Sequence, residues 1–459
     1  MKKLIELIKK NPALKFYDAE TQRTLLGKDI TTNFFEKKDA KKLAFLYLDN
    51  SLNALEAFWH FFDSPHALVL LNPKLDRALK YSLEGNYAPT FIYDTTRDDI
   101  TDYKPIDFIN NQKFFETVKP AKNKIHRNLK ILLTTSGTTG SPKLVRLSEK
   151  NIVSNALSII QYLPIKSDDV TPLNLSVYYS YGLSILTTNA IAGGTIVCTN
   201  KDIMNKEFWT DFETLGYTTM AGVPYVYEML YRIGFLKKEY PALRYMTQAG
   251  GKLSAKLVEL FAAHLENQNK FFFVMYGQTE ATARMSYLPP QYLKTKTGSI
   301  GIAIPGGKFS LASETNELIY VGANVFGGYV TSGEDLPYFE KINMLYTGDI
   351  ATCDTDGFYY ITGRMKRFIK IFGTRTSLDE VEALLKNEFI GKEFAVLGDN
   401  DENLWVCTLN TDLDGADIKQ FLKNKIQIHP SVVKIITLKS FPLTPNGKTN
   451  YNFIKTHLQ

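Results

Sequence analysis

The sequence predicts an α/β protein with a large N-terminal domain of layered mixed sheets and a smaller α+β domain at the C-terminal end. Up to residue 362, short apolar runs such as residues 68–71 and 271–274 alternate with longer segments of helical periodicity. Strands that alternate with helices are typical of layered, largely parallel sheets. From residue 363 onward, the remaining strand and helix candidates suffice for a separate core of about a hundred residues. We therefore predict domains at 1–362 and 363–459.

The first predicted element is an amphipathic helix over residues 1–10, where Leu4, Ile5, Leu7 and Ile8 stand among lysines. This apolar run is too broken for a secretory signal. No run of roughly 18 apolar residues indicates a membrane span. We expect a soluble, cytoplasmic protein.

Buried strands are predicted where apolar residues follow one another in short runs, and Ser148 is a plausible N-cap for a helix that continues to residue 160. Residues 317–320 and 358–361 look more like hairpins or a small barrel. The C-terminal domain is expected to contain helices at 379–386 and 416–425. The predicted strands are 45–47, 68–71, 131–133, 195–197, 271–274, 368–371, 394–397 and 405–408.

Composition excludes several classes of protein. The chain has 459 residues, 44% of them hydrophobic and 22% charged, which is typical of a globular protein. Its net charge of +6 suits anionic ligands but is far from the balance of a nucleic-acid-binding protein. The three cysteines are scattered, so neither a disulfide framework nor a zinc site is indicated.

A glycine- and hydroxyl-rich segment directly follows the strand candidate 131–133. Its glycines allow the backbone to fold closely around an anion, its hydroxyls can donate hydrogen bonds to phosphate oxygens, and a lysine adds charge. It is not a Walker A loop, because serine and proline separate the last glycine from the lysine. The candidate phosphate-binding residues are Thr135, Ser136, Gly137, Thr138, Thr139, Gly140 and Lys143.

A second candidate segment, residues 276–280, follows the strand candidate 271–274. Tyr276 offers an aromatic face for stacking, Gly277 allows close approach, Thr279 can contact a phosphate and Glu280 can hold Mg²⁺.

Taken in order, these segments resemble the motifs of the adenylate-forming superfamily, which contains acyl-CoA synthetases, peptide-synthetase adenylation domains and luciferases. TSGTTGSPK resembles the superfamily's phosphate loop, and YGQTE resembles the motif that stacks adenine, contacts the α-phosphate and holds Mg²⁺. The resemblance spans residues 130–450 and implies an ATP-binding N-terminal domain with a mobile C-terminal lid.

The resemblance also assigns roles within the nucleotide site. Gly250 and Gly251 border adenine, and Gln278 belongs to the adenine-binding motif. Asp349 matches the ribose-binding aspartate, and Arg364 matches the arginine beside the domain boundary.

Three lid residues take their roles from the same resemblance. Lys366 stands at the hinge, where the superfamily commonly has aspartate and sometimes lysine. Gly373 lies in the loop that faces the thiol arm, and Lys448 matches the catalytic lysine that offsets charge at the α-phosphate.

The acid pocket and the phosphate loop depart from the superfamily's pattern. Tyr179 stands where a gating histidine is common, and Ala249 borders the acyl pocket. Leu144 replaces the glycine that usually follows the loop lysine. The N-terminal third is short, so a long fatty-acid tunnel is not expected.

The implied activity is an AMP-forming ligase that uses Mg²⁺ and ATP to adenylate a small carboxylic acid and then passes the acyl group to a thiol. CoA is the first choice of acceptor, with a phosphopantetheine arm on an acyl carrier protein as the alternative. The alternative from a different functional class is a nucleotide-binding protein without catalytic activity. An assay of ATP–pyrophosphate exchange distinguishes it from an enzyme.

Overall fold

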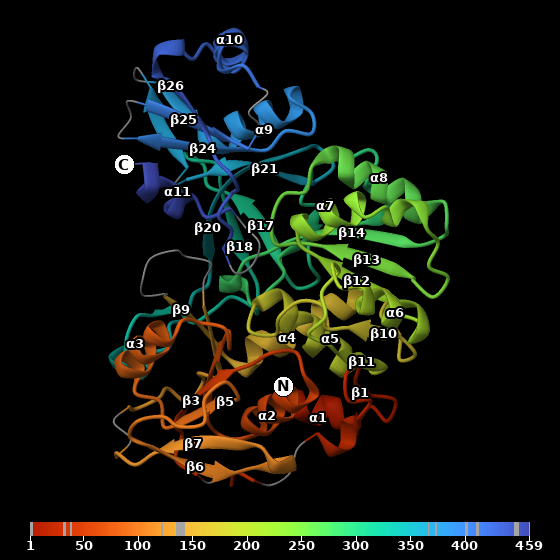
Figure 1. The fold of residues 1–459 in the computed structure, drawn as a ribbon, viewed down its shortest axis with the longest axis vertical. Coiled ribbons are helices and arrows are strands. Elements are labelled where there is room, and N and C mark those ends of the chain that lie inside the picture. Colours follow the sequence, from red (N-terminus) through yellow and green to blue (C-terminus); the bar gives the residue numbers. More distant parts are fainter. Residues whose placement is uncertain are drawn as a thin grey trace. The chain divides into compact units, whose positions relative to one another are not determined.

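The computed structural model describes residues 3–30, 34–36, 39–120, 123–134, 143–365, 367–371, 374–399, 403–409, 413–444 and 449–458. The chain divides into two compact units (Figure 1). Unit 1 comprises Met1–Lys308 and Tyr320–Leu345, and unit 2 comprises Phe309–Ile319 and Tyr346–Gln459. Among the described residues, no helix is long and apolar enough to cross a membrane.

The largest sheet of unit 1 has eight strands in the order β19-β9-β8-β4-β3-β5-β7-β6. Its centre, β8-β4-β3-β5, is parallel, and the outer strands pair antiparallel. β3 and β4 are buried along their whole length, as expected for central parallel strands covered on both faces. The strands are β3 (Leu43–Tyr47), β4 (Ala67–Leu71), β5 (Phe91–Asp94), β6 (Tyr103–Asp107), β7 (Lys113–Thr117), β8 (Ile131–Thr134), β9 (Leu144–Leu147) and β19 (Tyr329–Val330).

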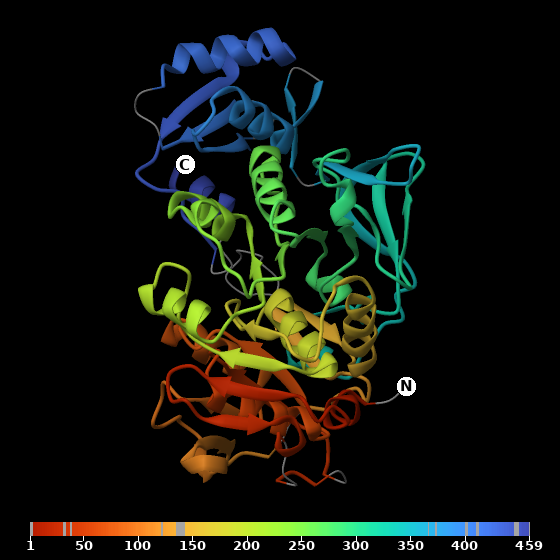
Figure 2. The ribbon, with the colours of Figure 1, turned by 90° about the vertical axis from the view of Figure 1, so that its right-hand side faces the viewer.

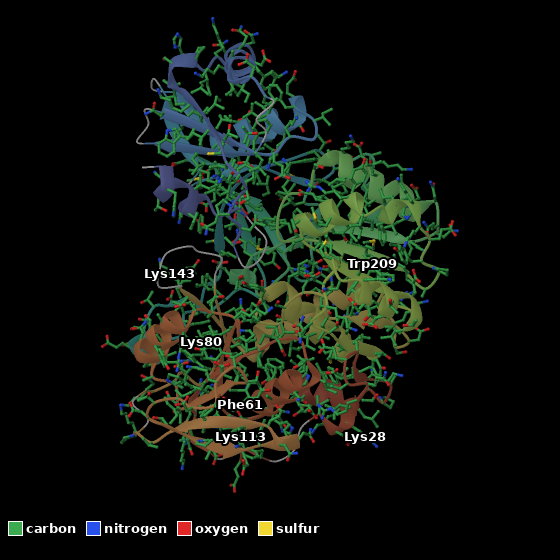
Figure 3. All side chains as sticks on the ribbon, viewed as in Figure 1. Lys28, Phe61, Lys80, Lys113, Lys143 and Trp209 are labelled. Atoms are coloured by element: carbon green, nitrogen blue, oxygen red, sulfur yellow. The ribbon has the colours of Figure 1, made fainter. Side chains whose placement is uncertain are left out.

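Two helices connect the central parallel strands: α2 (Leu52–Asp63) joins β3 to β4, and α3 (Arg77–Tyr87) joins β4 to β5. Phe61 of α2 is labelled in Figure 3. Its ring centroid lies 6.1 Å from that of Phe91 and 5.5 Å from that of Phe114. This aromatic packing fixes the helix on the sheet.

A second, four-stranded sheet has the order β10-β11-β1-β2. Its strands are β1 (Lys15–Asp18), β2 (Thr24–Leu26), β10 (Val170–Pro172) and β11 (Thr195–Cys198). The predicted amphipathic N-terminal helix is confirmed as α1 (Leu4–Lys9), which buries Leu4, Ile5 and Ile8. α6 (Lys206–Thr214) follows β11 along the chain.

The third sheet of unit 1 has the order β12-β13-β14-β15-β16, with β12, β13 and β14 parallel. Alternate residues of β14 face opposite layers. Phe273 and Met275 pack in one cluster with Tyr181 of α5, whereas Phe272 packs against Tyr227 and Phe261 of α7 and α8. The strands are β12 (Thr219–Gly222), β13 (Tyr245–Gln248), β14 (Phe271–Tyr276), β15 (Ser286–Leu288) and β16 (Ile302–Ala303), and the helices are α4 (Glu149–Tyr162), α5 (Ser180–Ala192), α7 (Pro224–Arg232) and α8 (Ala255–Glu266).

Unit 2 contains most of a four-stranded sheet, β17-β18-β20-β21, and a three-stranded sheet, β24-β25-β26. Figure 2 shows them as separate layers, the first teal and the second blue. Its strands are β17 (Lys308–Leu311), β18 (Glu317–Val321), β20 (Leu345–Cys353), β21 (Tyr359–Arg364), β22 (Phe368–Ile371), β23 (Thr374–Ser377), β24 (Phe394–Asp399), β25 (Asn403–Thr408) and β26 (Val433–Thr437), and its helices are α9 (Leu378–Glu388), α10 (Gly415–Ile426) and α11 (Tyr451–Leu458).

The predicted α/β class with layered sheets is confirmed. The N-cap at Ser148 is also confirmed, because the Asn151 N–H donates to its Oγ at 3.1 Å and α4 begins one residue later. The helices predicted at 379–386 and 416–425 lie within α9 and α10. The small barrel and the domain boundary after residue 362 stay predictions.

A buried lysine stands just before β8. Lys130 is only 7% exposed, and its Nζ donates to the carbonyl oxygens of Ser64 at 2.8 Å and His66 at 3.1 Å. Burial, and then the positive charge of Lys41, lower the pKa of Lys130 to about 7. Folding therefore favours the neutral amine at this position.

Candidate functional site

The chain leaves β14 through a tight turn that only glycine permits. A Cβ on Gly277 would lie 1.8 Å from the Ala283 carbonyl oxygen, because the chain folds back against itself there. Next to it, Gln278 Nε2 donates to the Tyr276 hydroxyl at 3.4 Å. The turn therefore presents the following residues at the carboxyl end of a parallel strand, where ligands bind in open α/β sheets.

Thr279 and Glu280 follow in a single 3₁₀ turn, Thr279–Ala281. The hydroxyl of Thr279 lies 3.4 Å from that of Ser180, the first residue of α5. The predicted phosphate-contacting threonine thus lies at the positive end of a thirteen-residue helix.

The Glu280 carboxylate has a partner that the sequence analysis missed. The Tyr329 hydroxyl donates to Glu280 Oε1 at 2.8 Å, and burial together with this carboxylate raises the pKa of Tyr329. The Phe326 N–H donates to the Glu280 carbonyl oxygen at 2.8 Å, which fixes the backbone of the same residue. The pair Gly327-Gly328 just before Tyr329 was the available signal, since glycines often mark a close backbone approach.

Lys143 joins this group from the phosphate-loop candidate. Its Nζ lies 5.8 Å from the centroid of the Tyr329 ring, and Lys143 itself is labelled in Figure 3. The proximity follows from strand pairing, because Val145 of β9 is opposite Tyr329 of β19. The loop begins after β8 and ends at β9, and these two strands form an antiparallel pair in which Thr134 is opposite Leu144. The candidate residues Thr135, Ser136, Gly137, Thr138, Thr139 and Gly140 lie outside the described residues.

The predicted adenine-side residues follow the end of β13. Ala249 is buried, and its N–H donates to the Gly222 carbonyl oxygen at 3.2 Å. Gly250 has a φ of +86°, which explains why glycine occupies the position. The carbonyl oxygen of Gly251 accepts a bond from Gln248 Nε2 at 2.9 Å. The third sheet therefore brings the ends of β13 and β14 to one edge, because these strands are parallel neighbours.

Tyr179 precedes α5 and is half-buried. Its ring centroid lies 4.6 Å from that of Tyr178, and burial raises the pKa of its hydroxyl. Tyr179 is therefore a neutral aromatic residue at ordinary pH.

Asp349 and Arg364 come together within unit 2. They are opposite each other in the antiparallel pair β20–β21, and Arg364 Nε donates to Asp349 Oδ1 at 3.0 Å. The Asp349 side chain is 3% exposed, whereas that of Arg364 is 57% exposed. The predicted roles of Lys366, Gly373 and Lys448 fall on positions outside the described residues.

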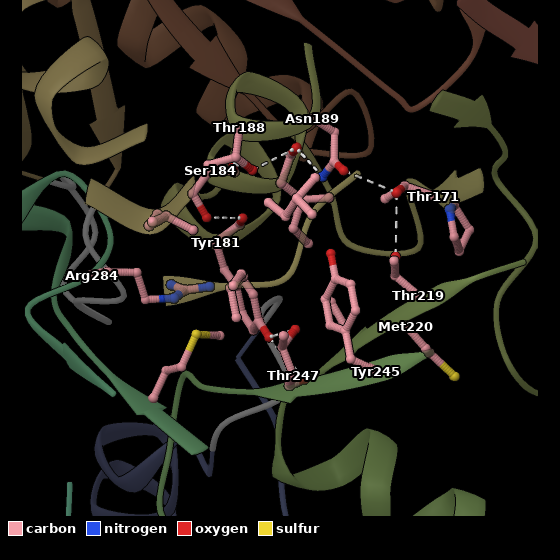
Figure 4. Close-up of a pocket in the computed structure, with 17 residues that line it drawn as sticks. Thr171, Tyr181, Ser184, Thr188, Asn189, Thr219, Met220, Tyr245, Thr247 and Arg284 are labelled. Atoms are coloured by element: carbon pink, nitrogen blue, oxygen red, sulfur yellow. Dashed lines mark hydrogen bonds between the residues drawn. The ribbon is translucent and has the colours of Figure 1, made fainter. Parts of the chain in front are cut away.

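A pocket lies within unit 1 between α4, α5 and the third sheet (Figure 4). The space between its lining atoms amounts to about 410 Å³, a figure that includes open solvent. Tyr181 of α5, Thr247 of β13, Met275 of β14 and Arg284 all line it. The sequence analysis did not select Arg284, although it is the one charged residue between positions 281 and 293.

Comparison with known proteins now defines the class. A family model described as "AMP-binding enzyme" matches residues 52–333, more than half of the chain. The chain belongs to this family, so the resemblance drawn from the motifs is confirmed. Among its curated relatives, oxalate–CoA ligase of Arabidopsis thaliana is 26% identical over 351 residues, 71% of this chain and 67% of that protein. D-alanine–D-alanyl carrier protein ligase of Lactococcus lactis is 29% identical over 348 residues, 70% of this chain and 68% of that protein.

The solved structures agree on the fold. o-Succinylbenzoate CoA synthetase (MenE) from Bacillus subtilis, in complex with an acyl-adenylate intermediate, has a TM-score of 0.79 at 19% identity and covers 99% of this chain and 98% of that one. The same enzyme, in complex with ATP and magnesium ion, gives a TM-score of 0.75 at 17% identity, covering 99% of each chain.

Proposed function

We propose that this chain is an AMP-forming ligase that activates a small carboxylic acid with ATP and transfers the acyl group to a thiol. In the first step a carboxylate oxygen of the acid attacks the α-phosphorus of ATP, and the bond to the bridging oxygen breaks to release pyrophosphate. In the second step the thiol sulfur attacks the acyl carbon, its proton is lost, and AMP leaves.

The observation that carries this proposal is the grouping at the end of β14. Thr279 lies against the start of α5, Glu280 is held by Tyr329, and the Lys143 ammonium lies beside the same tyrosine. A hydroxyl, a carboxylate and an ammonium in this arrangement match a phosphate chain with its counter-ion. Phosphoryl positioning and charge compensation are what such a reaction requires of the protein.

The residues present fit a magnesium ion. Mg²⁺ takes oxygen ligands and is usually held by one or two carboxylates together with substrate phosphates. Glu280 would supply the carboxylate, with the Tyr329 hydroxyl on one of its oxygens to orient it. When bound, the ion would withdraw charge from the phosphate oxygens.

We further propose that residues 363–459 act as a lid that turns about Lys366, with Lys448 offsetting charge in the first step and Gly373 facing the thiol arm in the second. In unit 2, Asp349 would accept the ribose hydroxyls, and its pairing with Arg364 holds its carboxylate in place. Tyr179 and Ala249 would border the acid.

CoA is the proposed acceptor, and a phosphopantetheine arm on a carrier protein is the alternative. Both kinds of acceptor occur in the names of the curated relatives.

The test is ATP–pyrophosphate exchange across a panel of carboxylic acids, followed by product analysis with CoA or a loaded carrier protein added. Acid-dependent exchange supports the ligase. If ATP binds but no acid on the panel supports exchange, the chain is a nucleotide-binding protein without this activity.

A further inference from the structure

The pocket behind the Thr279–Glu280 turn contains a buried cation without an acidic partner. Arg284 is 4% exposed, and its Nε makes no hydrogen bond. Among the residues that the structure describes, no carboxylate is paired with it. Its guanidinium carbon lies 3.9 Å from the centroid of the Tyr181 ring, and Figure 4 shows the side chain reaching toward that ring.

The backbone around Arg284 is held in place from two sides. Asn155 of α4 and Asn324 each donate a side-chain N–H to the Arg284 carbonyl oxygen at 2.9 Å. The cation is therefore built into the pocket before any ligand arrives. A buried charge without a counter-ion is costly, so the arrangement suits a site whose counter-ion comes with the ligand.

Several other polar groups of the pocket are already hydrogen-bonded within the protein. The Tyr181 hydroxyl donates to the Thr247 carbonyl oxygen at 3.0 Å, and the Ser184 and Thr188 hydroxyls donate to carbonyl oxygens of their own helix at 2.7 Å and 2.6 Å. Apolar side chains complete the wall, among them Ile159, Leu163 and Met275. Arg284 is thus the group in this lining best placed to recognise a charged ligand.

The pocket and the proposed reaction site share the first turn of α5. Ser180 contacts Thr279, and the next residue, Tyr181, stacks with Arg284. A short acid can therefore place one end near the phosphate-contacting threonine and the other near the guanidinium.

We propose, building on the ligase function above, that the acid is a short dicarboxylic acid: one carboxylate is adenylated, and the second pairs with Arg284. An ammonium group at this end of the acid does not fit, because the lining contains no carboxylate to match it and Arg284 would repel it.

The experiment compares matched acids in ATP–pyrophosphate exchange. Butanedioic, pentanedioic and hexanedioic acids are each tested beside their monoamide and the monocarboxylic acid of equal length, with D-alanine as the probe that carries an ammonium group. We expect kcat/KM for a dicarboxylic acid to exceed that for its monoamide by about tenfold to a hundredfold, the range for a charge-assisted hydrogen bond.

Arg284→Met should remove this preference, whereas Arg232→Met, an exposed arginine of α7, should keep it. The Tm of Arg284→Met should stay the same or rise, since an unpaired buried charge is lost. The best dicarboxylic acid should also raise the Tm of the wild-type protein but not that of Arg284→Met.

The outcomes separate the two proposals. If exchange with monoamides, monocarboxylic acids or D-alanine equals or exceeds that with the dicarboxylic acids, the proposed role of Arg284 is wrong. The proposed ligase function is unaffected by that result. An equal loss for every acid in Arg284→Met, with a lowered Tm, also overturns it and assigns the arginine to packing. Absence of exchange with every acid removes the ligase function itself.

Discussion

Replacing Gly277 with alanine tests whether the turn after β14 positions the reacting groups. The added Cβ would lie 1.8 Å from the Ala283 carbonyl oxygen, whereas real Cβ contacts below 3.0 Å essentially never occur. The difference, 3.0 − 1.8 = 1.2 Å, is the least distance by which the two backbone segments must separate. A misplacement of about 1 Å can cost on the order of a hundredfold in rate. We expect Gly277→Ala to lose about that much ATP–pyrophosphate exchange.

The matched control is Gly85→Ala. Gly85 lies in α3, where an added Cβ meets nothing within 4 Å, so this substitution should leave exchange unchanged. It should also stabilise the protein slightly, because alanine favours helix over glycine by about 0.5–1 kcal/mol. Circular dichroism and Tm of both variants show whether unit 1 remains folded.

Wild-type exchange by a folded Gly277→Ala variant would refute the reasoning, because the turn would then tolerate the displacement. Loss of exchange together with global unfolding would assign Gly277 to folding rather than to positioning. Retention of fold with loss of exchange is the expected result.

Three further predictions concern Lys448 of the proposed lid, Asp349 of the proposed ribose site and the buried Lys130. Lys448→Ala should reduce exchange by on the order of a hundredfold or more while ATP affinity, measured by calorimetry, changes only a few-fold; near-normal exchange would contradict its role. Asp349→Ala should weaken ATP binding by about 1.5–3 kcal/mol, because the ribose loses a charged acceptor; unchanged affinity would leave Asp349 as a partner of Arg364 only. Lys130 has a pKa of about 7 in the folded protein and 10.5 ordinarily. Between these pH values the unfolded chain binds more protons than the folded one. The free energy of unfolding should therefore rise with pH in this range, by at most ~1.4 kcal/mol per pH unit. Urea unfolding at about pH 7.5 and about pH 9 should show this rise in wild type and in the exposed control Lys150→Met but not in Lys130→Met, and equal slopes in all three would refute it.

The order of elements and the motifs could be predicted from the sequence, but the contacts between distant segments could not. A local signal sufficed for the cap at Ser148, because the cap depends on neighbouring residues. Arg284 escaped notice because its burial depends on Tyr181, which lies over a hundred positions earlier in the chain. The glycine pair before Tyr329 signals a close backbone approach but does not show that β19 pairs with β9, nor that the Tyr329 hydroxyl donates to Glu280.

Lys130 illustrates the same limit for ionisation. From the sequence alone, a lysine beside an apolar strand is expected to be solvated. The structure shows instead that Lys130 is buried and that its amine donates to the carbonyl oxygens of Ser64 and His66. Burial is a property of the assembled layers, so a shifted pKa could not be predicted from the sequence around it.

Leu144, which replaces the superfamily's usual glycine, gives the phosphate-loop candidate a distinctive anchor. Its side chain is fully buried in the core with Leu132 and Val330, and its backbone belongs to β9. We therefore expect the backbone of Leu144 to be exposed to solvent only when the sheet that contains β9 unfolds. Hydrogen exchange should therefore be slow from Leu144 onward, whatever the state of the preceding loop. If nucleotide binds at this loop as proposed, it could therefore bind and dissociate without opening the sheet to which the loop is attached.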